Sequence, residues 1–322
     1  MATIREIAKA AGVSVGTASR AITGNGYVSE ETRAQVLSVA AKLGYQPKEH
    51  MRAARSARTI GIILPDITFP FYGNFLKYAD VELAQRGYRT VVCNALGIRN
   101  RVSDMLDLLE RRELDGLILN ADVTAADVAR IEKLPVVSFE RILGSKIPVV
   151  ASDHLLGGQL AASEFLRCGC KNVLILTVKH DNPMLGDIRV SECRRVLEAE
   201  GVKVTVAETP GTLLTIRMLK ELANEYMRVY SGVDGIFTED MTAYCCTQAA
   251  AVYGIQVPEQ LKIVGYDGNE IIRIANPPLT TIEQNIPLLA RTCIDLLLRK
   301  IDGEKLTEGV TIPVTFLKGG TT

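Results

Sequence analysis

The sequence is short of the residues that most enzymes and metal-binding proteins use. It holds three histidines, no tryptophan and only 5% aromatic residues in 322 positions. It contains no G-x-S-x-G sequence, no glycine-rich phosphate loop and no two close Cys or His pairs that would form a four-ligand zinc site. We therefore expect no catalytic residues, no cofactor and no metal.

Long apolar runs are also absent. No stretch of about 18 consecutive apolar residues occurs, which argues against a membrane span. The first ten residues, MATIREIAKA, are charged and lack the apolar region of a secretory signal. The seven cysteines have no disulfide-framework spacing and indicate reduced thiols. Together these features predict a cytoplasmic protein.

The net charge is zero but unevenly distributed. Residues 1–58 carry nine Lys/Arg and four Asp/Glu, whereas the remaining residues carry 28 and 33. A basic head on an acidic body fits contact between the head and a polyanion, and it equally fits a solvated helical face. Charge alone does not decide between the two.

The first 46 residues predict three short helices. Thr3 and Glu6 form a capping box, and Gly12 ends the first helix. Ser14 and Ser29 are good N-caps for the second and third helices. Helical spacing predicts that the head packs on these apolar residues: Ile4, Ile7, Ala8, Ala11, Val36, Leu37, Val39, Ala40 and Leu43.

Two helices joined by a tight turn predict a helix-turn-helix, whose second helix enters the major groove of DNA. The second helix here, within VSVGTASRAI, is small and rich in hydroxyls. Three small residues are expected to let it approach DNA closely: Gly16, Ala18 and Ala21. Its polar residues are expected to contact phosphates or bases: Ser14, Thr17, Ser19 and Arg20. A three-helix structural cap is the alternative interpretation.

From Thr59 onward the pattern changes to apolar runs separated by helical stretches. The runs are TIGIIL, RTVVCN, DGLILN, PVVSF, NVLILT, VKVTV, DGIFT and LKIVGYD. Alternation of this kind predicts parallel sheets buried on both faces. About eight strands are too many for one mononucleotide-type unit. We expect two doubly wound lobes, a chain crossing near residues 145–152, and a ligand cleft at the carboxyl ends of the strands.

The segment TIREIAKAAGVSVGTASRAITG resembles the head of the lactose-repressor (LacI/GalR) family of bacterial transcription regulators. Further family landmarks follow in order: LGYQP, IGIILPDITFPFYGNF, VSFER, ASDHLLGG, VPEQLKIVGYD and PPLTTIEQNIPLLARTCIDLLL. The resemblance covers essentially the whole chain. It implies a three-helix helix-turn-helix head (1–46), a hinge (47–58) and an effector-binding and dimerisation domain (59–322). The last is an α/β core of two doubly wound parallel-sheet lobes of periplasmic-binding-protein type.

The resemblance also implies which residues of the head contact DNA. Val15 and Gly16 occupy the two positions that select the operator. Thr23 stands where the family usually has Asn. The remaining residues at family contact positions are Thr3, Ser14, Thr17, Ser19, Arg20, Tyr27 and Ser29.

The hinge departs from the family pattern N-x-x-A-R-x-L, in which the leucine pair of a dimer wedges into the minor groove. Lys48 replaces the Asn, Arg52 keeps the Arg, and Ala54 stands where the Leu should be. Met51 is the alternative wedge, because methionine also serves as an intercalating side chain. Whether this hinge kinks DNA is left open by the sequence.

Charged and aromatic residues predicted at the strand ends match family effector positions. They are Phe69, Phe71, Tyr72, Glu140, Arg141, Asp153, Arg189, Glu239, Asp240 and Asp267. Carboxylates and arginines that converge in a cleft suit vicinal hydroxyls or an anion. Several neighbours depart from the family, since Glu192-Cys193, Glu239 and Gly268 replace its Gly-Phe, Asn and second Asp.

The resemblance therefore implies a sequence-specific transcription regulator, expected to be a repressor, that binds a palindromic operator as a homodimer. A small polar effector, a sugar or sugar phosphate, is expected in the cleft. Control by a protein co-repressor is the alternative. Through its operator, the protein is expected to associate with the bacterial nucleoid. A periplasmic sugar-binding protein would share the two lobes but carry a signal peptide and no basic head.

Overall fold

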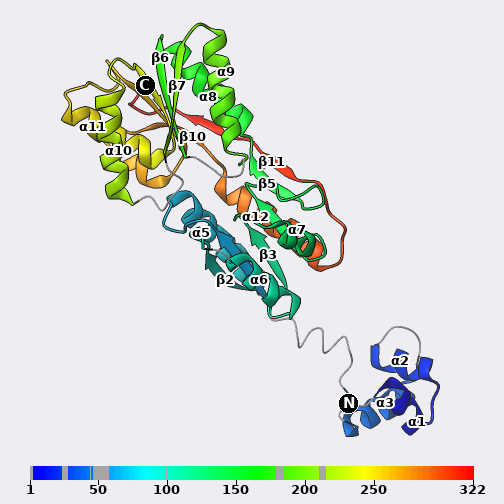
Figure 1. The fold of residues 1–322 in the computed structure, drawn as a ribbon. Coiled ribbons are helices and arrows are strands. Elements are labelled where there is room, and N and C mark those ends of the chain that lie inside the picture. The colour runs from blue at the N-terminus through cyan, green and yellow to red at the C-terminus, as the bar shows by residue number, and fades with distance from the viewer. Residues whose placement is uncertain are drawn as a thin grey trace. The chain divides into compact units, whose positions relative to one another are not determined.

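The computed structural model of the chain describes residues 3–23, 28–43, 45, 58–98, 100–178, 184–209 and 215–322. The chain divides into two compact units, residues 1–57 and residues 58–322 (Figure 1). The first unit contains the helices of the head. The second contains the two sheets of the core.

The head consists of α1 (Ile4–Ala10), α2 (Val15–Thr23) and α3 (Glu30–Lys42). Thr3 and Glu6 form the predicted capping box, and Gly12 adopts the left-handed φ of 66° that ends a helix without strain at glycine. The hydroxyls of Ser14 and Ser29 accept hydrogen bonds from the amides of Thr17 and Thr32. The small core of the head is built from Ile7, Ala8, Ala11, Ala18, Ala21, Val36 and Ala40.

Two residues predicted for that core lie outside it. Leu37 is 45% exposed and Leu43 is 43% exposed. Leu37 is turned by about 100° from the buried Val36, so it leaves the contact face. Leu43 follows the last helical residue and lies beyond the stripe that Val36 and Ala40 bury.

The first sheet of the core, with its helices, forms the N-lobe. Its strands are all parallel, in the order β11 (Val310–Ile312), β5 (Val149–Ser152), β4 (Val136–Phe139), β3 (Gly116–Leu119), β1 (Thr59–Leu64) and β2 (Arg89–Asn94). One face is covered by α5 (Pro70–Gln85) and α12 (Ile286–Ile301). The other is covered by α6 (Arg101–Glu110) and α7 (Ala125–Ile131). Because both faces are covered, β1 is apolar at every position except Thr59 and Gly61.

The second sheet forms the C-lobe. Its strand order is β12 (Thr315–Leu317), β10 (Thr280–Glu283), β9 (Lys262–Asp267), β8 (Gly235–Phe237), β6 (Asn172–Val178) and β7 (Lys203–Thr209), with only β12 antiparallel. One face packs on α8 (His154–Arg167) and α9 (Asp187–Ala199). The other packs on α10 (Ile216–Val229) and α11 (Asp240–Val252), and a short 3-10 helix spans Glu270–Ile274. The predicted pair of doubly wound lobes is confirmed.

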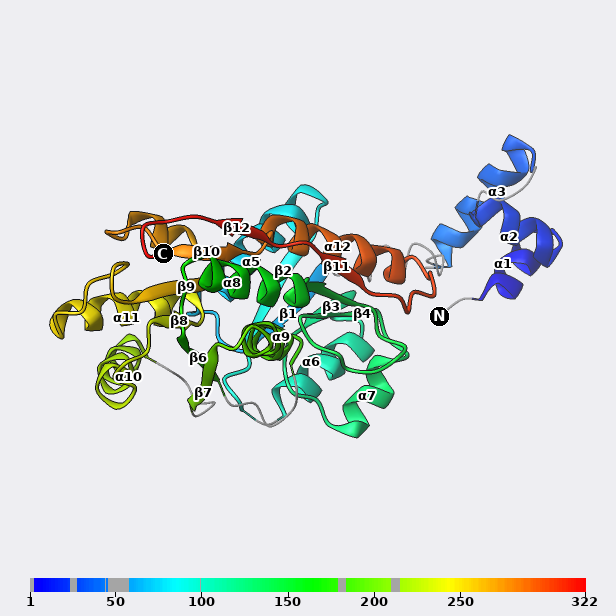
Figure 2. The same cartoon turned by 90° about the horizontal axis from the view of Figure 1, so that it is seen from above.

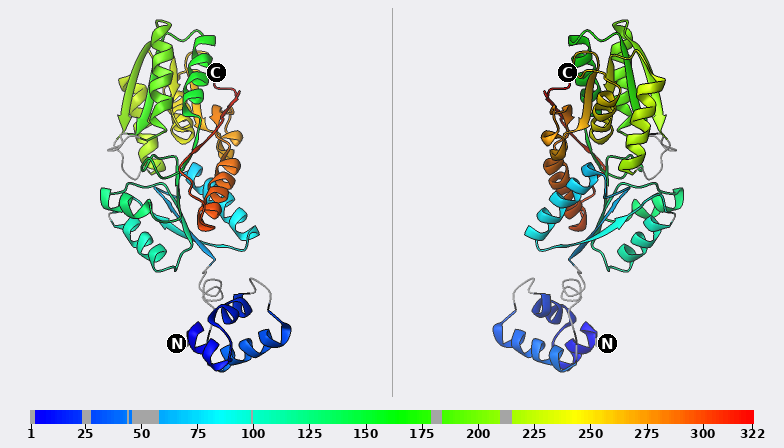
Figure 3. Two further views of the ribbon diagram at one scale, coloured as in Figure 1. Left: turned by 90° about the vertical axis from the view of Figure 1, so that its right-hand side faces the viewer. Right: turned by 90° about the vertical axis from the view of Figure 1, so that its left-hand side faces the viewer.

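The chain passes between the lobes three times: at Asp153, at residues 284–285 and at residues 313–314. Figures 2 and 3 show the lobes joined by these segments. The crossing predicted within residues 145–152 in fact follows them, because Val149–Ser152 forms β5 of the N-lobe. The described residues contain twelve strands rather than about eight. The four strands that were not predicted, β5, β10, β11 and β12, have three or four residues each.

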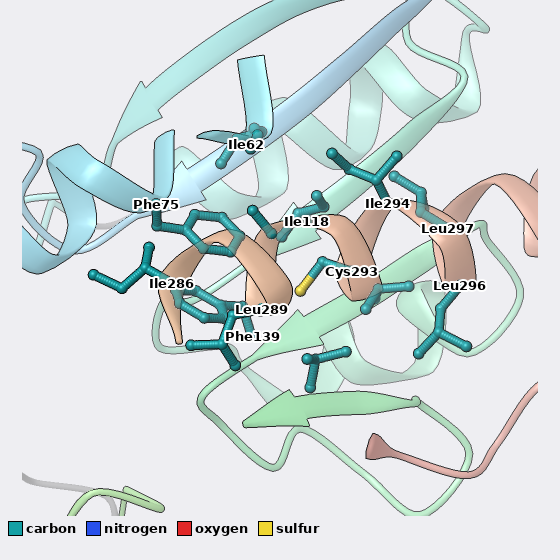
Figure 4. Close-up of a cluster of buried hydrophobic side chains, with 14 of the residues drawn as sticks. Ile62, Phe75, Ile118, Phe139, Ile286, Leu289, Cys293, Ile294, Leu296 and Leu297 are labelled. Carbon is teal, nitrogen blue, oxygen red and sulfur yellow. The ribbon is translucent and has the colours of Figure 1, made fainter. Parts of the chain in front are cut away.

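Helix α12 ties the end of the chain back into the N-lobe. It follows β10 of the C-lobe in sequence, yet Cys293, Ile294 and Leu297 are buried in the N-lobe core (Figure 4). They share this core with Phe75 of α5 and Ile118 of β3. The N-lobe can therefore be completed only after strands β6 to β10 of the C-lobe have been synthesised.

Candidate functional site

Two acidic residues mark strand ends in opposite lobes. Glu140 follows β4 and Asp267 ends β9. Both have positive φ, 56° and 113°, a backbone strain that is common at functional sites. The Glu140 carboxylate accepts a 2.8 Å hydrogen bond from the Ser152 amide, and its second oxygen lies 2.6 Å from His154 Nε2. The Asp267 carboxylate accepts a 2.8 Å bond from Gln284 Nε2.

The guanidinium of Arg189 covers the ring of Tyr266, with its carbon 4.0 Å from the ring centroid. Burial disfavours the charge of Arg189, but the neighbouring Tyr266 and Asp267 outweigh it and leave the pKa of Arg189 raised. Burial raises the pKa of Asp267 to about 7, although Arg189 opposes that rise. Burial, then the charge of Glu140, raises the pKa of Tyr72 to about 12. These interactions show that residues of both lobes converge.

Glu239 and Asp240 lie together at the start of α11, and each is held by the protein. The Glu239 carboxylate caps the helix by accepting bonds from the amides of Met241 and Thr242 at 2.6 and 2.8 Å. Burial raises the pKa of Glu239 and also that of Asp240. Asp240 is fully buried, and its oxygens accept bonds from the Asn269 amide and the Thr281 hydroxyl at 2.7 and 2.6 Å. Asp240 therefore joins α11 to the strand ends.

Arg141 and Asp153 lie on the N-lobe side and at the first crossing. Arg141 is buried and forms a 2.5 Å ion pair with Asp122, while its Nε has no protein partner. Asp153 is half-buried and caps α8 through a 2.9 Å bond from the Leu156 amide. Asp153 also lines a cavity of about 430 Å³ between the lobes, with Leu155, Ile188 and Thr311. This cavity reaches only Asp153 among the predicted effector residues.

The three aromatic candidates near the start of α5 differ in their surroundings. Phe69 is half-buried as the N-cap of α5. Phe71 is buried in the N-lobe core and stacks on Phe139 at 5.7 Å. Tyr72 meets Phe71 edge-on and is half-buried. Tyr72 is therefore close enough to Glu140 and Asp267 for their charges to raise its pKa, whereas Phe71 packs in the N-lobe core.

Several polar residues of this region were not predicted. Asn120, Ser152, Asn269 and Gln284 are buried, and each has a side-chain atom without a protein partner. Buried polar groups are normally paired, so unpaired groups at strand ends are suited to a polar ligand. Asn120 follows the strand of DGLILN and could have been found from that position; the others are brought in by the fold.

In the head, the predicted DNA-facing residues of α2 form its solvent side. Ser14, Val15, Gly16 and Arg20 are exposed, and Val15 is 48% exposed. Thr17 and Ser19 are half-buried. The Arg20 side chain lies along the helix, donating from Nε to the Gly16 carbonyl at 3.3 Å.

The small residues of α2 have a different role from the one predicted. Ala18 and Ala21 are buried against α1 and α3 and do not face solvent. Only Gly16 lies on the exposed side, where an added Cβ would meet Arg20 and Ser14 at ordinary contact distances. Small side chains in α2 thus serve chiefly to pack a compact three-helix unit.

Thr3 and Ser29, predicted to contact DNA, are the exposed N-caps of α1 and α3. The remaining predicted DNA contacts, Tyr27, Met51, Arg52 and Ala54, lie outside the described residues, as does most of the predicted hinge.

Comparison with known proteins gives concordant matches. Residues 3–48 match the family model described as bacterial regulatory proteins, lacI family, and residues 162–322 match a periplasmic binding protein-like domain. The chain is 34% identical to the sucrose operon repressor of Streptococcus mutans, over 99% of both chains. It is 33% identical to the ribose operon repressor of Bacillus subtilis, over 100% of this chain and 99% of the relative. The chain belongs to the lacI family.

A solved lacI-family regulator from Enterococcus faecalis, with bound ribose, superimposes with a TM-score of 0.71 at 27% identity. It covers 82% of this chain and 98% of its own. As a lacI-family chain, the protein is a DNA-binding transcription regulator with a periplasmic-binding-protein-like core. None of its described helices is long and apolar enough to cross a membrane. Among the described residues, no cluster of three or more His, Cys, Asp or Glu side chains is arranged to hold a metal ion.

Proposed function

We propose that the protein is a repressor that binds a palindromic operator as a homodimer and responds to a neutral sugar in the cleft between the lobes. The observation that carries the effector site is the convergence of Glu140 and Arg141 of the N-lobe with Arg189 and Asp267 of the C-lobe. A ligand that contacts both lobes binds one lobe arrangement better than another, which is the requirement for control.

The charge of the cleft favours a neutral ligand. It holds four acidic side chains, Glu140, Glu239, Asp240 and Asp267, against two arginines, one of which pairs with Asp122. Burial raises the pKa of Glu239, Asp240 and Asp267, and none of the four groups can neutralise a phosphate. A phosphate dianion needs surplus cations, whereas sugar hydroxyls donate to carboxylates and accept from guanidinium groups. The named relatives act on sucrose and ribose operons, and the neighbour from Enterococcus faecalis holds ribose.

Exposed apolar residues support the dimer. The outer strand β2 of the N-lobe sheet exposes Val91 and Val92, and Ile98 follows it. In the C-lobe, Val252 and Ile274 are even more exposed. An exposed edge strand of this kind can pair with another chain. Two heads on one dimer would double the contacts to a two-fold symmetric operator.

The α2 residues support reading of bases by Val15 and Gly16 and anchoring by Arg20. Selection of random duplexes with the wild-type protein should return one palindromic sequence. Replacing Val15 and Gly16 by other residues should change the selected sequence. If the same sequence returned, the assigned register of α2 on DNA would be wrong. Sedimentation of the free protein should give a dimer at micromolar concentration.

Matched pairs of ligands test the effector. Thermal shift with D-ribose and ribose 5-phosphate, and with D-fructose and fructose 6-phosphate, should show binding by a neutral member and none by its phosphate. Binding by the phosphates would contradict the charge argument. No shift with any sugar, together with intact operator binding, would favour control by a protein partner.

A further inference from the structure

A line of hydrogen-bonded side chains crosses from one lobe to the other beside the first chain crossing. Glu140 belongs to the N-lobe, His154 is the first residue of α8, and Tyr266 lies on β9 of the C-lobe. His154 Nε2 lies 2.6 Å from the Glu140 carboxylate, and His154 Nδ1 lies 2.9 Å from the Tyr266 hydroxyl. His154 is 4% exposed, so it is enclosed by protein.

The contact between His154 and Tyr266 depends on a close approach of α8 to β9. An added Cβ at Gly157 would lie 2.6 Å from the Tyr266 hydroxyl, and one at Gly158 would lie 2.6 Å from the Arg189 carbonyl. Larger residues would therefore push α8 away from both. The two glycines allow the first turn of α8 to reach the tyrosine and α9 together.

The line ends in a predicted effector residue on each side. Glu140 supplies a carboxylate from the N-lobe, and Arg189 packs on the Tyr266 ring in the C-lobe. His154 lies between them and contacts both Glu140 and Tyr266. Buried polar networks of this kind specify one arrangement when every member is satisfied.

We propose that His154 is a positioning residue for effector binding. It holds the Glu140 carboxylate in register with the Tyr266–Arg189 pair, so that one ligand can contact both lobes, and it does so without touching the ligand. This inference rests on the proposed function of the cleft as an effector site.

The chemistry of the three groups defines the variants. A carboxylate only accepts, so His154 Nε2 donates to Glu140, and in the neutral ring Nδ1 accepts from the Tyr266 hydroxyl. A glutamine also has one donor and one acceptor end, whereas leucine has neither. His154→Gln should therefore preserve the line and His154→Leu should break it. Tyr266→Phe removes a single oxygen, and Tyr226→Phe, at a buried tyrosine of α10, is the matched control.

The first measurement needs no ligand. The chain has no tryptophan, and Thr311 is exposed on β11 at the wall of the cavity between the lobes, so Thr311→Trp places a unique fluorophore there. In this background, His154→Leu and Tyr266→Phe should increase iodide quenching of the tryptophan. His154→Gln and Tyr226→Phe should leave quenching as in the parent. Unchanged quenching in both disrupting variants would overturn the proposal.

The second measurement is calorimetric titration of the full-length variants with D-ribose, D-fructose and sucrose. For any sugar that binds wild type, His154→Leu should weaken binding by about ten- to a hundredfold, the loss expected for a hydrogen bond to a charged group. Tyr266→Phe removes a bond between neutral groups and should weaken binding by about two- to tenfold. His154→Gln should stay within about threefold of wild type. Equal losses in the leucine and glutamine variants would overturn the proposal. If no sugar binds wild type, the effector class is wrong, and the quenching experiment still decides the role of His154.

Discussion

The head and the cleft hold their functional residues in opposite ways. In the head, the side chains proposed to contact DNA are exposed or half-buried, and bonds between residues three apart orient them, as in Thr3–Glu6 and Ser14–Thr17. In the cleft, the acidic residues Glu140, Asp240 and Asp267 are buried, and hydrogen bonds over long separations hold the site, 112 residues for His154–Tyr266. Local sequence therefore specifies the first site, whereas the fold assembles the second.

The two regions also differ in how water treats their charges. Arg20 is exposed, so its charge is solvated and available to a polyanion. Asp267 is enclosed, and burial raises its pKa to about 7. The arginine of the head is therefore exposed to water, whereas the cleft contains an acidic group whose pKa is raised by burial.

The largest expected effect is in the cleft. Asp267→Ala and Arg189→Ala should each weaken binding of the cognate sugar by about ten- to a hundredfold, because each removes a charged hydrogen-bonding group. Operator affinity without sugar should match wild type, since both residues belong to the core unit. Calorimetry and operator titration measure the two quantities. If both variants responded to the sugar as wild type does, the assignment of the cleft as the effector site would be wrong, and control by a protein partner would be favoured.

Arg20→Ala tests the head at nearly the same scale. Removal of a contact worth about 1–3 kcal/mol should weaken binding by roughly ten- to a hundredfold on every operator variant. Lys42→Ala, at the exposed end of α3, is the control that loses the same charge away from α2. Gel-shift titrations at fixed salt give the affinities. Equal losses in the two variants would mean that net charge, and not the position of Arg20, controls binding.

A smaller effect is expected on the stability of the head when a buried residue of α3 is replaced instead of its exposed neighbour. Val36→Ala should destabilise the head by about 1–3 kcal/mol because Val36 is fully buried, whereas Leu37→Ala should stay within about 0.5 kcal/mol of wild type. Hydrogen exchange of α3 amides in the full-length protein reports the difference. Equal protection of the α3 amides in the two variants would contradict the conclusion that Val36 is buried and Leu37 is not.

The last effect concerns pH. A folded pKa of about 7 for Asp267, above the unfolded value of about 3.9, means that the folded state binds the extra proton and loses stability as pH rises between these values. Asp267→Asn removes this loss and can still accept the bond from Gln284. Its melting temperature should therefore exceed that of wild type at pH 8, and the advantage should be absent near pH 4. A variant less stable than wild type at pH 8 would show that the carboxylate stabilises the fold.

Much of the fold could be predicted from patterns in the chain. The capping box at Thr3 and the long buried strands such as Thr59–Leu64 follow from local preferences, and both are confirmed. Prediction failed where an element was short, as in β5, or where a residue faced a direction that its neighbours decide, as in Leu37 and Ala18. Burial depends on which surfaces meet, and that information is not local.

The cleft was predicted less completely than the head. Strand-end positions and family resemblance indicated Glu140, Arg189 and Asp267, which both lobes bring together. The same reasoning passed over His154 and Asn269, because a lone histidine and a loop asparagine have no motif. Neither shows its role until residues far apart in the chain are brought into contact.

The helix ends of the head, the alternation of strands and helices, and the lacI-family pattern follow directly from the order of residues along the chain. The first two rest on near neighbours, because capping and periodicity act over a few residues. In contrast, the packing of α12 in the N-lobe, the full enclosure of Asp240 and the link from Glu140 through His154 to Tyr266 arise only when the chain is folded. Those facts depend on chain crossings that bring distant residues together and exclude water from their charges, and desolvation exists only once both lobes are folded.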